Sequence, residues 1–300
     1  MKPRTAFLGL ALLLVVGFAG CAPKEETIVA DYGKLLEQPL TASQLRETGA
    51  FLDERLASVK VETASSMVYS YEDLLVRYAS ELPERTEWDE LATYFDAATG
   101  RLNEEKLAGS ERKSFVEDLS AGNFRFAVFE GKMVLRVDYE ALSQRYGKYM
   151  DPAQVRLFEL QAAVTDRPIT ENATLQVTYP RMLQRAKAAE ELLREFPEEE
   201  LIRADALWIY TSHINAILMG ATNSPVFDYK TGDFSRDARD AYEEFLRDGT
   251  DSTLSWVLLE YSTYLDSIGY RLDYSDKTAS KVFFDTCSWL VSEAEKRVQK

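Results

Sequence analysis

Residues 179–196, with the sequence YPRMLQRAKAAEELLREF, carry the helical pattern that recurs through most of this chain. Their apolar side chains return every three or four positions and therefore share one face of a helix. The same spacing predicts further helices over residues 41–60, 66–82, 87–95, 103–119, 139–149, 152–164, 198–220, 235–248, 253–264 and 275–298. We expect a mainly α protein made of helical hairpins in an α-solenoid-like array.

One segment departs from this pattern. Residues 123–139, NFRFAVFEGKMVLRVDY, partly alternate apolar and polar side chains on either side of Glu130-Gly131-Lys132. Alternation indicates β-strands, and a glycine between two strands suits a tight turn. We predict one small β-hairpin here, and we expect residues 221–234 to form the longest irregular stretch.

Three short matches link the first part of the chain to the last. Pro39-Leu40-Thr41 returns as Pro168-Ile169-Thr170, Phe95-Asp96-x-x-Thr99-Gly100 as Phe227-Asp228-x-x-Thr231-Gly232, and Arg136-Val137-Asp138-Tyr139 as Arg271-Leu272-Asp273-Tyr274. The matches keep their order and a similar separation, but the helices between them align poorly. Duplication into two related halves and chance similarity therefore both stay open.

Residues 1–20 have the layout of an export signal. Lys2 and Arg4 precede an apolar run over residues 6–19, and small residues follow directly before Cys21. The run is too short for a bilayer-spanning helix. Phe18-Ala19-Gly20-Cys21 resembles the lipobox of bacterial lipoproteins, although Phe18 stands where that motif favours Leu.

The lipobox resemblance implies that residues 1–20 are removed and that Cys21 becomes a lipid-modified first residue at the outer side of a membrane. Residues 22–30, APKEETIVA, would then form a flexible tether. Ala22, rather than Asp, follows the cysteine, which favours the outer membrane of a two-membrane bacterium. A single-membrane host would place the protein on the outer face of its cell membrane. An ordinary cleavable signal or an uncleaved anchor is the alternative.

Two segments of the second half resemble the tetratricopeptide-like hairpins of bacterial envelope lipoproteins. Residues 186–197, AKAAEELLREFP, end in the aromatic-Pro pair that closes a helix in that family, whereas residues 241–252, AYEEFLRDGTDS, have Gly249-Thr250 at that place. The resemblance implies stacked hairpins that dock a protein or peptide. Residues 138–168, with Tyr146-Gly147-Lys148-Tyr149, resemble uncharacterised lipoproteins of Gram-positive type, which implies no particular activity.

These patterns divide the chain into four parts. We expect a signal peptide over residues 1–20, a lipidated N-terminus and tether over residues 21–30, a helical half with the β-hairpin over residues 31–166, and a half of helical hairpins over residues 167–300.

The chain is strongly acidic. It has 35 Lys and Arg against 50 Asp and Glu, and removal of Lys2 and Arg4 with the signal leaves 33 basic side chains and a net charge of −17. A field of that sign repels phosphate backbones and anionic lipid surfaces, so we expect no nucleic-acid partner. With 46% hydrophobic residues, the chain is able to bury a full core in one large domain or two smaller ones.

The residue types on which most enzymes rely are scarce. His213 is the only histidine, and Cys287 is the only thiol besides Cys21. Zinc sites of the usual kinds and a serine nucleophile with a histidine base are therefore disfavoured. Glycine-rich phosphate loops do not occur in the sequence. We expect no cofactor, no metal and no catalytic residue, and a buried, unreactive Cys287 thiol.

Paired carboxylates leave one class of enzyme open, the hydrolysis of cell-wall glycosidic bonds. Solvated helix faces account better for the acidic runs, which are Asp89-Glu90, Glu104-Glu105 and Glu198-Glu199-Glu200.

The second half supplies the candidate ligand-binding side chains, because aromatic rings with polar tips suit grooves that hold peptides or sugars. These candidates are Trp208, Tyr210, His213, Asn223, Asp228 and Tyr229. Two plainer interpretations stand beside this one. His213 lies on an apolar helical stripe, as a core histidine would. Asp228 is placed to cap a turn at Thr231-Gly232, and the spacing of nearby acids fails the EF-hand calcium pattern.

Three functions follow as hypotheses. The first is a membrane-anchored, extracytoplasmic lipoprotein that acts as a protein- or peptide-binding or scaffolding module of the cell envelope. The second is a solute-binding receptor, which the shortage of alternating strands and helices weakens. The third and weakest is a carboxylate-based cell-wall hydrolase.

Overall fold

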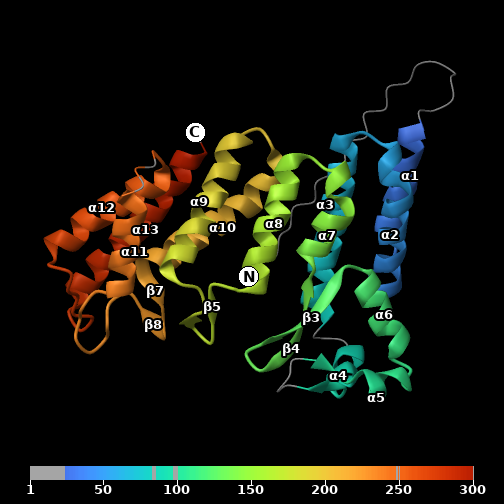
Figure 1. Cartoon of the computed structure of the whole chain (residues 1–300), viewed down its shortest axis with the longest axis horizontal. Helices are drawn as coiled ribbons and strands as arrows, with labels where there is room; N and C mark the ends of the chain where they lie inside the picture. The colour runs from blue at the N-terminus through green and yellow to red at the C-terminus, as the bar shows by residue number, and fades with distance from the viewer. Residues whose placement is uncertain (1–23, 83–85, 97–100, 248, 250, 300) are drawn as a thin grey trace.

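The computed structural model describes residues 24–82, 86–96, 101–247, 249 and 251–299, and within them the protein is mainly helical. The molecule is elongated (Figure 1). α1 (Lys24–Leu36) and α2 (Ala42–Arg55) lie at one end of its long axis, and α12 (Thr253–Ser267) and α13 (Lys277–Val298) lie at the other. The predicted signal peptide, the lipobox and Cys21 fall outside the described residues.

The elements of the first half surround the predicted hairpin. After α1 and α2 come α3 (Val61–Glu81), α4 (Thr86–Ala92), β1 (Phe95–Asp96), β2 (Arg101–Leu102), α5 (Glu104–Ala108), α6 (Lys113–Ala121), β3 (Phe124–Phe129), β4 (Lys132–Val137), α7 (Tyr139–Tyr146) and α8 (Pro152–Asp166).

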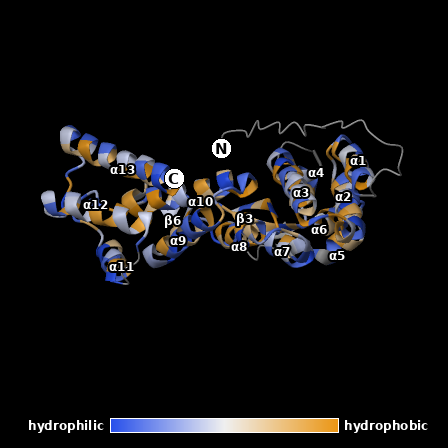
Figure 2. Ribbon diagram, turned by 90° about the horizontal axis from the view of Figure 1, so that it is seen from above, coloured by the Kyte–Doolittle hydropathy of each residue, from blue (hydrophilic) through white to orange (hydrophobic). Residues whose placement is uncertain are grey.

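The second half pairs short hairpins with long helices. It contains β5 (Thr170–Glu171), β6 (Thr174–Leu175), α9 (Tyr179–Glu195), α10 (Glu200–Met219), β7 (Gly220–Ala221), β8 (Ser224–Pro225), α11 (Arg236–Arg247), α12 and α13. Seen from above, α9, α10 and α8 follow one another between α12 and α7 (Figure 2).

Several helices begin where the sequence predicts them, because a polar side chain satisfies their first free backbone amides. The Thr41 hydroxyl accepts a hydrogen bond from the Gln44 amide at 3.1 Å, and the Asn103 side chain accepts from the Lys106 amide at 3.0 Å. The Asp151 carboxylate accepts from the Ala153 amide at 2.8 Å, at the start of α8. These helices therefore begin within one residue of the predicted starts at residues 41, 103 and 152.

Two predictions about helices were wrong. The helix expected over residues 103–119 is two helices, α5 and α6, and the chain turns between them at Gly109, which lacks the side chain that favours continuation. The flexible tether expected over residues 22–30 is helical from Lys24 onward. Ile28 is buried in the core of the first half, and this burial holds the segment against α2 and α3.

The predicted β-hairpin is confirmed, but it is one of four within the described residues. β3 and β4 pair antiparallel from Phe124–Val137 to Phe129–Lys132, and both turn residues, Glu130 and Gly131, have positive φ, as a tight hairpin turn requires. The other three sheets have strands of two residues, which are too short to show an alternating pattern in the sequence. Residues 221–234, expected to be irregular, contain part of one of these sheets.

Three of these hairpins, β3–β4, β5–β6 and β7–β8, contact one another through their turns along one edge of the molecule, at the bottom of Figure 1. The Glu171 carboxylate accepts from the Glu130 amide at 2.8 Å, and the Glu130 carboxylate accepts from the Asn172 amide at 2.9 Å. The next hairpin is joined in the same way, since the Asn223 amide donates to the Ala173 carbonyl at 2.8 Å. This row of hairpins therefore links the two halves.

Buried apolar side chains form two cores that meet at α8. Leu157 and Leu160 of α8 belong to the core of the second half, whereas Phe158 belongs to the core of the first half. Successive residues of a helix point in different directions, so one helix serves both cores. The two halves consequently have α8 in common and are not joined by a flexible linker.

Of the three sequence matches between the halves, one has a similar backbone pairing in both halves and another does not. Phe95 pairs with Leu102 and Phe227 pairs with Phe234, so the paired positions are seven residues apart at both Phe-Asp-x-x-Thr-Gly matches. Thr41, in contrast, caps a helix, whereas Thr170 begins a strand. Duplication of the two halves stays a prediction.

Candidate binding groove between α8 and α9

An open groove of about 500 Å³ lies between α8 and α9, at the junction of the two halves. Four arginines line it, together with two acids and several apolar side chains. Two of the arginines belong to α9, one belongs to α8, and one directly follows α8. The arginines are Arg156, Arg167, Arg181 and Arg185. This concentration of positive charge stands out in a chain with a net charge of −15.

Arg185 is the buried member of this group, with 6% of its surface exposed. Its guanidinium donates to the backbone carbonyl of Arg167 at 2.8 Å and to that of Ala163, and so caps the C-terminal end of α8. Nε has no hydrogen-bond partner among the described residues. Burial lowers the pKa of Arg185, and the neighbouring charges of Arg181 and Arg167 lower it further. The guanidinium is thus held by carbonyl dipoles and faces other cations.

The remaining arginines are more accessible. Arg156 pairs with Glu195 and lies 5.8 Å from the centre of the Phe196 ring, so its charge is partly compensated. Arg181 is exposed and donates to the Gln184 side chain at 2.8 Å. Arg167 is exposed as well. Exposed guanidinium groups beside a buried one make a surface suited to carboxylates or phosphates, which accept two parallel hydrogen bonds from arginine.

Two acids of the groove reduce this charge without cancelling it. Glu159 is exposed, and Asp166 is already paired with Arg125. Small apolar residues lie between the charges: Ala163 is exposed and Ala188 is half-buried. The groove therefore combines a net positive charge with room for apolar atoms to approach the backbone.

Sequence reasoning missed this groove. The signal that was available is local: residues 156–187 carry five basic and three acidic side chains, the reverse of the overall balance. The arginines come from two helices and a loop, however, and only the packing of α8 on α9 brings them together.

The six side chains predicted to bind a ligand fall into two separate environments. Three of them, Trp208, Tyr210 and His213, lie on α10 and do not converge. Trp208 has 59% of its surface exposed, whereas Tyr210 and His213 are fully buried. The structure therefore does not bring these three residues into one site.

His213 has the surroundings of a core histidine. Its Nδ1 lies 2.7 Å from the Ile209 carbonyl, and Nε2 is buried without a partner in the described part of the chain. Burial lowers the pKa of His213 from 6.5 to about 4, and the charge of Arg185 adds to this effect while the Ile209 carbonyl opposes it. The imidazole is consequently neutral at physiological pH.

The other three candidates, Asn223, Asp228 and Tyr229, line a second open hollow of about 590 Å³ beside the β7–β8 hairpin. Asp228 accepts from the Lys230 and Thr231 amides at 2.8 Å each, and these bonds lower its pKa. It builds the turn, as the plainer interpretation expects. Tyr229 has 58% of its surface exposed and lies 4.8 Å from the Tyr274 ring, so it offers an aromatic platform at the rim.

Glu190 is a buried acid that sequence reasoning did not single out. Its carboxylate accepts from the Thr253 amide at 2.7 Å, the Leu254 amide at 2.9 Å and the Tyr210 hydroxyl at 3.2 Å. A negative charge at these amides stabilises the N-terminus of α12. Burial, followed by the charge of Glu190, raises the pKa of Tyr210. The Glu190 carboxylate thus links α9, α10 and α12 through hydrogen bonds and stabilises the fold.

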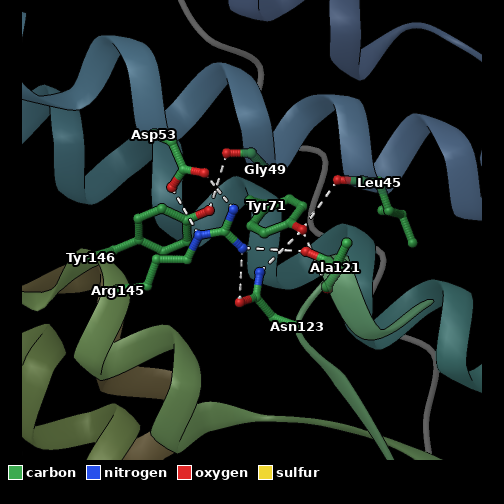
Figure 3. A network of polar contacts seen from close by, with 9 residues as sticks. Leu45, Gly49, Asp53, Tyr71, Ala121, Asn123, Arg145 and Tyr146 are labelled. Carbon is green, nitrogen blue, oxygen red and sulfur yellow. Dashed lines mark hydrogen bonds and ion pairs between the residues drawn. The ribbon is translucent and has the colours of Figure 1, made fainter. Parts of the chain in front are cut away.

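A second polar network lies in the first half (Figure 3). Arg145 donates to Asp53 at 2.8 Å and to the Asn123 side chain at 3.2 Å. Asn123 in turn donates to the Tyr71 hydroxyl at 3.3 Å, and Tyr71 lies within hydrogen-bond distance of the carbonyls of Leu45 and Gly122. Burial raises the pKa of Tyr71 to about 12, which keeps its hydroxyl protonated. The network ties α2, α3 and α7 to the start of β3.

Cys287 is fully buried, and burial raises the pKa of its thiol to about 12. The prediction of a buried thiol is therefore confirmed.

The acidic runs lie mostly at the surface; the Glu104 side chain falls outside the described part of the structure. Asp89, Glu90, Glu105, Glu198 and Glu200 are exposed, and Glu199 is half-buried. Solvated faces thus account for them.

No known family, curated protein or solved structure matches the chain. In the described ranges, no helix has both the length and the apolar character needed to cross a bilayer. Nor do three or more His, Cys, Asp or Glu side chains gather into a metal-ion site within these ranges.

Proposed function

We propose that the protein is a membrane-anchored, extracytoplasmic lipoprotein that binds a protein or peptide partner of the cell envelope. The observation that carries the proposal is the arginine-lined groove between α8 and α9 in an otherwise acidic protein. Such a groove is suited to the recognition of an anionic partner, because four of its six charged side chains are arginines, which neither gain nor lose protons at physiological pH.

The arrangement of helices supports the same proposal. α9 and α10 pack along their length, and α8 packs against both of them. Neighbouring helices in this order resemble stacked helical hairpins, and arrays of such hairpins use an open face to dock partners. An α-solenoid-like array of this kind is the architecture we propose for the second half.

Crosslinking in intact cells, followed by purification of the protein, tests the function. We expect one specific envelope protein to be recovered. Recovery of abundant background proteins alone would argue against a binding module.

The anchor has its own test. Because lipid on Cys21 would hold the protein to a membrane, we expect Cys21→Ser to release it into the soluble fraction after cell fractionation. Mass spectrometry of the N-terminal peptide of the parent protein should detect the acyl chains. Membrane attachment that survives the substitution would show that the anchor is not lipid on this thiol.

A solute-binding receptor is the second candidate, and the exposed Tyr229 beside the hollow of about 590 Å³ favours it. A thermal-shift screen against sugars, amino acids and short peptides distinguishes the two functions. Stabilisation by a sugar that Tyr229→Ala abolishes would support the receptor, and a flat screen would remove it.

A further inference from the structure

The α8–α9 groove has a charge opposite to that of the protein around it. Of its charged lining residues, four are arginines and two are acids. Asp166 is engaged by Arg125, so it contributes little negative charge to the groove. Arg185 adds a positive charge whose hydrogen-bond partners are backbone carbonyls rather than a carboxylate. A bound anion would therefore neutralise the excess positive charge of this surface.

We propose that the α8–α9 groove binds an acidic peptide segment of the partner, with Arg167 and Arg181 contacting its carboxylates and Arg185 supplying a fixed charge beneath them. This inference rests on the proposed function and names the chemistry of its partner.

The length of the groove favours a peptide over a single small anion. Its lining extends along α8 from Arg156 to Asp166, a span of about 15 Å of helix, and continues to Arg167. One phosphate or carboxylate covers only a fraction of this length. A segment of about eleven residues in a helix, or fewer when extended, covers all of it.

The apolar lining favours a peptide for a second reason. Ala163 and Ala188 carry the smallest apolar side chains and have accessible surface between the charged groups. Aliphatic side chains of a bound segment would bury these methyl groups while its carboxylates remain beside the arginines. A polyanion without apolar atoms would leave this surface exposed.

Fluorescence anisotropy with a labelled peptide tests the proposal on the full chain purified in detergent. The probe is a peptide of about twelve residues with a helical stripe of Leu and flanking Glu, and its counterpart has Gln in place of every Glu. We expect the Glu peptide to bind, the Gln peptide to bind at least about tenfold more weakly, and the difference to shrink at about 0.5 M salt, which screens exposed charges.

Charge reversal locates the site. We expect Arg167→Glu with Arg181→Glu to weaken binding of the Glu peptide by about tenfold or more. The matched control is Arg236→Glu with Lys277→Glu, which makes the same change in net charge at two exposed positions that begin other helices. This control should bind like the parent protein. All four side chains are exposed, and circular dichroism checks that both variants fold.

Three results would overturn the proposal: equal binding of the Glu and Gln peptides, an equal loss in the control variant, or tight binding of polyphosphate that the Glu peptide fails to displace. The last of these would identify a phosphate polymer as the occupant.

Failure of this proposal is separable from failure of the proposed function. If crosslinking recovers one partner but the crosslinks lie away from residues 156–192, the protein is a binding module and the groove is not its site. If no partner is recovered, the function itself is wrong, whatever the synthetic peptide does.

Discussion

The two halves stabilise their cores in different ways. In the first half, a network of hydrogen bonds runs from the partly exposed Arg145–Asp53 pair to the buried hydroxyl of Tyr71. In the second half, aromatic rings pack directly on one another, with Phe234 and Phe283 in contact with several neighbours. Two buried hydroxyls there, those of Tyr242 and Tyr261, each donate to a single backbone carbonyl.

This difference indicates where each half is sensitive to change. A network with several partners loses many bonds when one member is removed, so the first half should respond most to loss of a polar group. A densely packed core tolerates no added atoms, so the second half should respond most to steric change and to buried charge.

The largest effect should come from Gly220→Ala, at the start of β7. Gly220 has a φ of +73°, and a Cβ there would lie 2.4 Å from the Ser224 carbonyl oxygen. We expect a loss of about 3 kcal/mol or more in the free energy of unfolding, measured by denaturant titration. Gly131→Ala in the first-half hairpin is the control, since its φ is also +73° but its surroundings are open; it should cost about 1 kcal/mol. Equal losses at the two sites would remove the steric contrast between the halves.

The second prediction concerns pH and His213. Its folded-state pKa of about 4 lies below the value of 6.5 expected in the unfolded chain, so the unfolded chain binds the proton first as pH falls. Stability should therefore be full above pH 6.5 and decline toward pH 4, by up to about 3 kcal/mol from this group.

His213→Gln separates this contribution from that of the carboxylates. Its stability, measured across the same pH range, should fall less steeply than that of the parent protein. Parallel curves would show that protonation of His213 does not govern acid sensitivity.

Paired tyrosine substitutions compare the two cores directly. Tyr71→Phe removes a hydroxyl that Asn123 and two backbone carbonyls share, and we expect it to cost about 2 kcal/mol. Tyr261→Phe removes one bond to the Leu218 carbonyl and should cost about 1 kcal/mol. Thermal unfolding of both variants measures the two losses in stability. A larger loss of stability for Tyr261→Phe would contradict the claim that the first half depends more on its buried polar groups.

The smallest effect should lie at the joint between the halves. Glu130 and Glu171 exchange hydrogen bonds with backbone amides across two hairpin turns, but Glu130 is exposed and Glu171 half-buried. A double-mutant cycle with Glu130→Ala and Glu171→Ala should yield a coupling energy below about 1 kcal/mol. A value well above this would mean that the row of hairpins, and not α8, holds the halves together.

Much of the local structure was accessible from the sequence. Apolar spacing predicted most helices, and polar residues such as Thr41 and Asp151 marked where they begin, because both signals depend on neighbours within one or two turns. The two-residue hairpins were not accessible. Ala173, for example, has a positive φ in the β5–β6 turn, a conformation that its side chain does not favour and that the surrounding contacts impose.

The charge balance, the helical class, the β3–β4 hairpin and the burial of Cys287 follow from the order of residues alone, since composition and short-range periodicity carry them. The sharing of α8 between two cores and the gathering of Arg167, Arg181 and Arg185 were decided only by tertiary packing. Each arginine by itself resembles any other exposed base on a helix or loop. The three positive charges gather in one groove because α8 and α9 pack side by side, and no pattern within either segment encodes that contact.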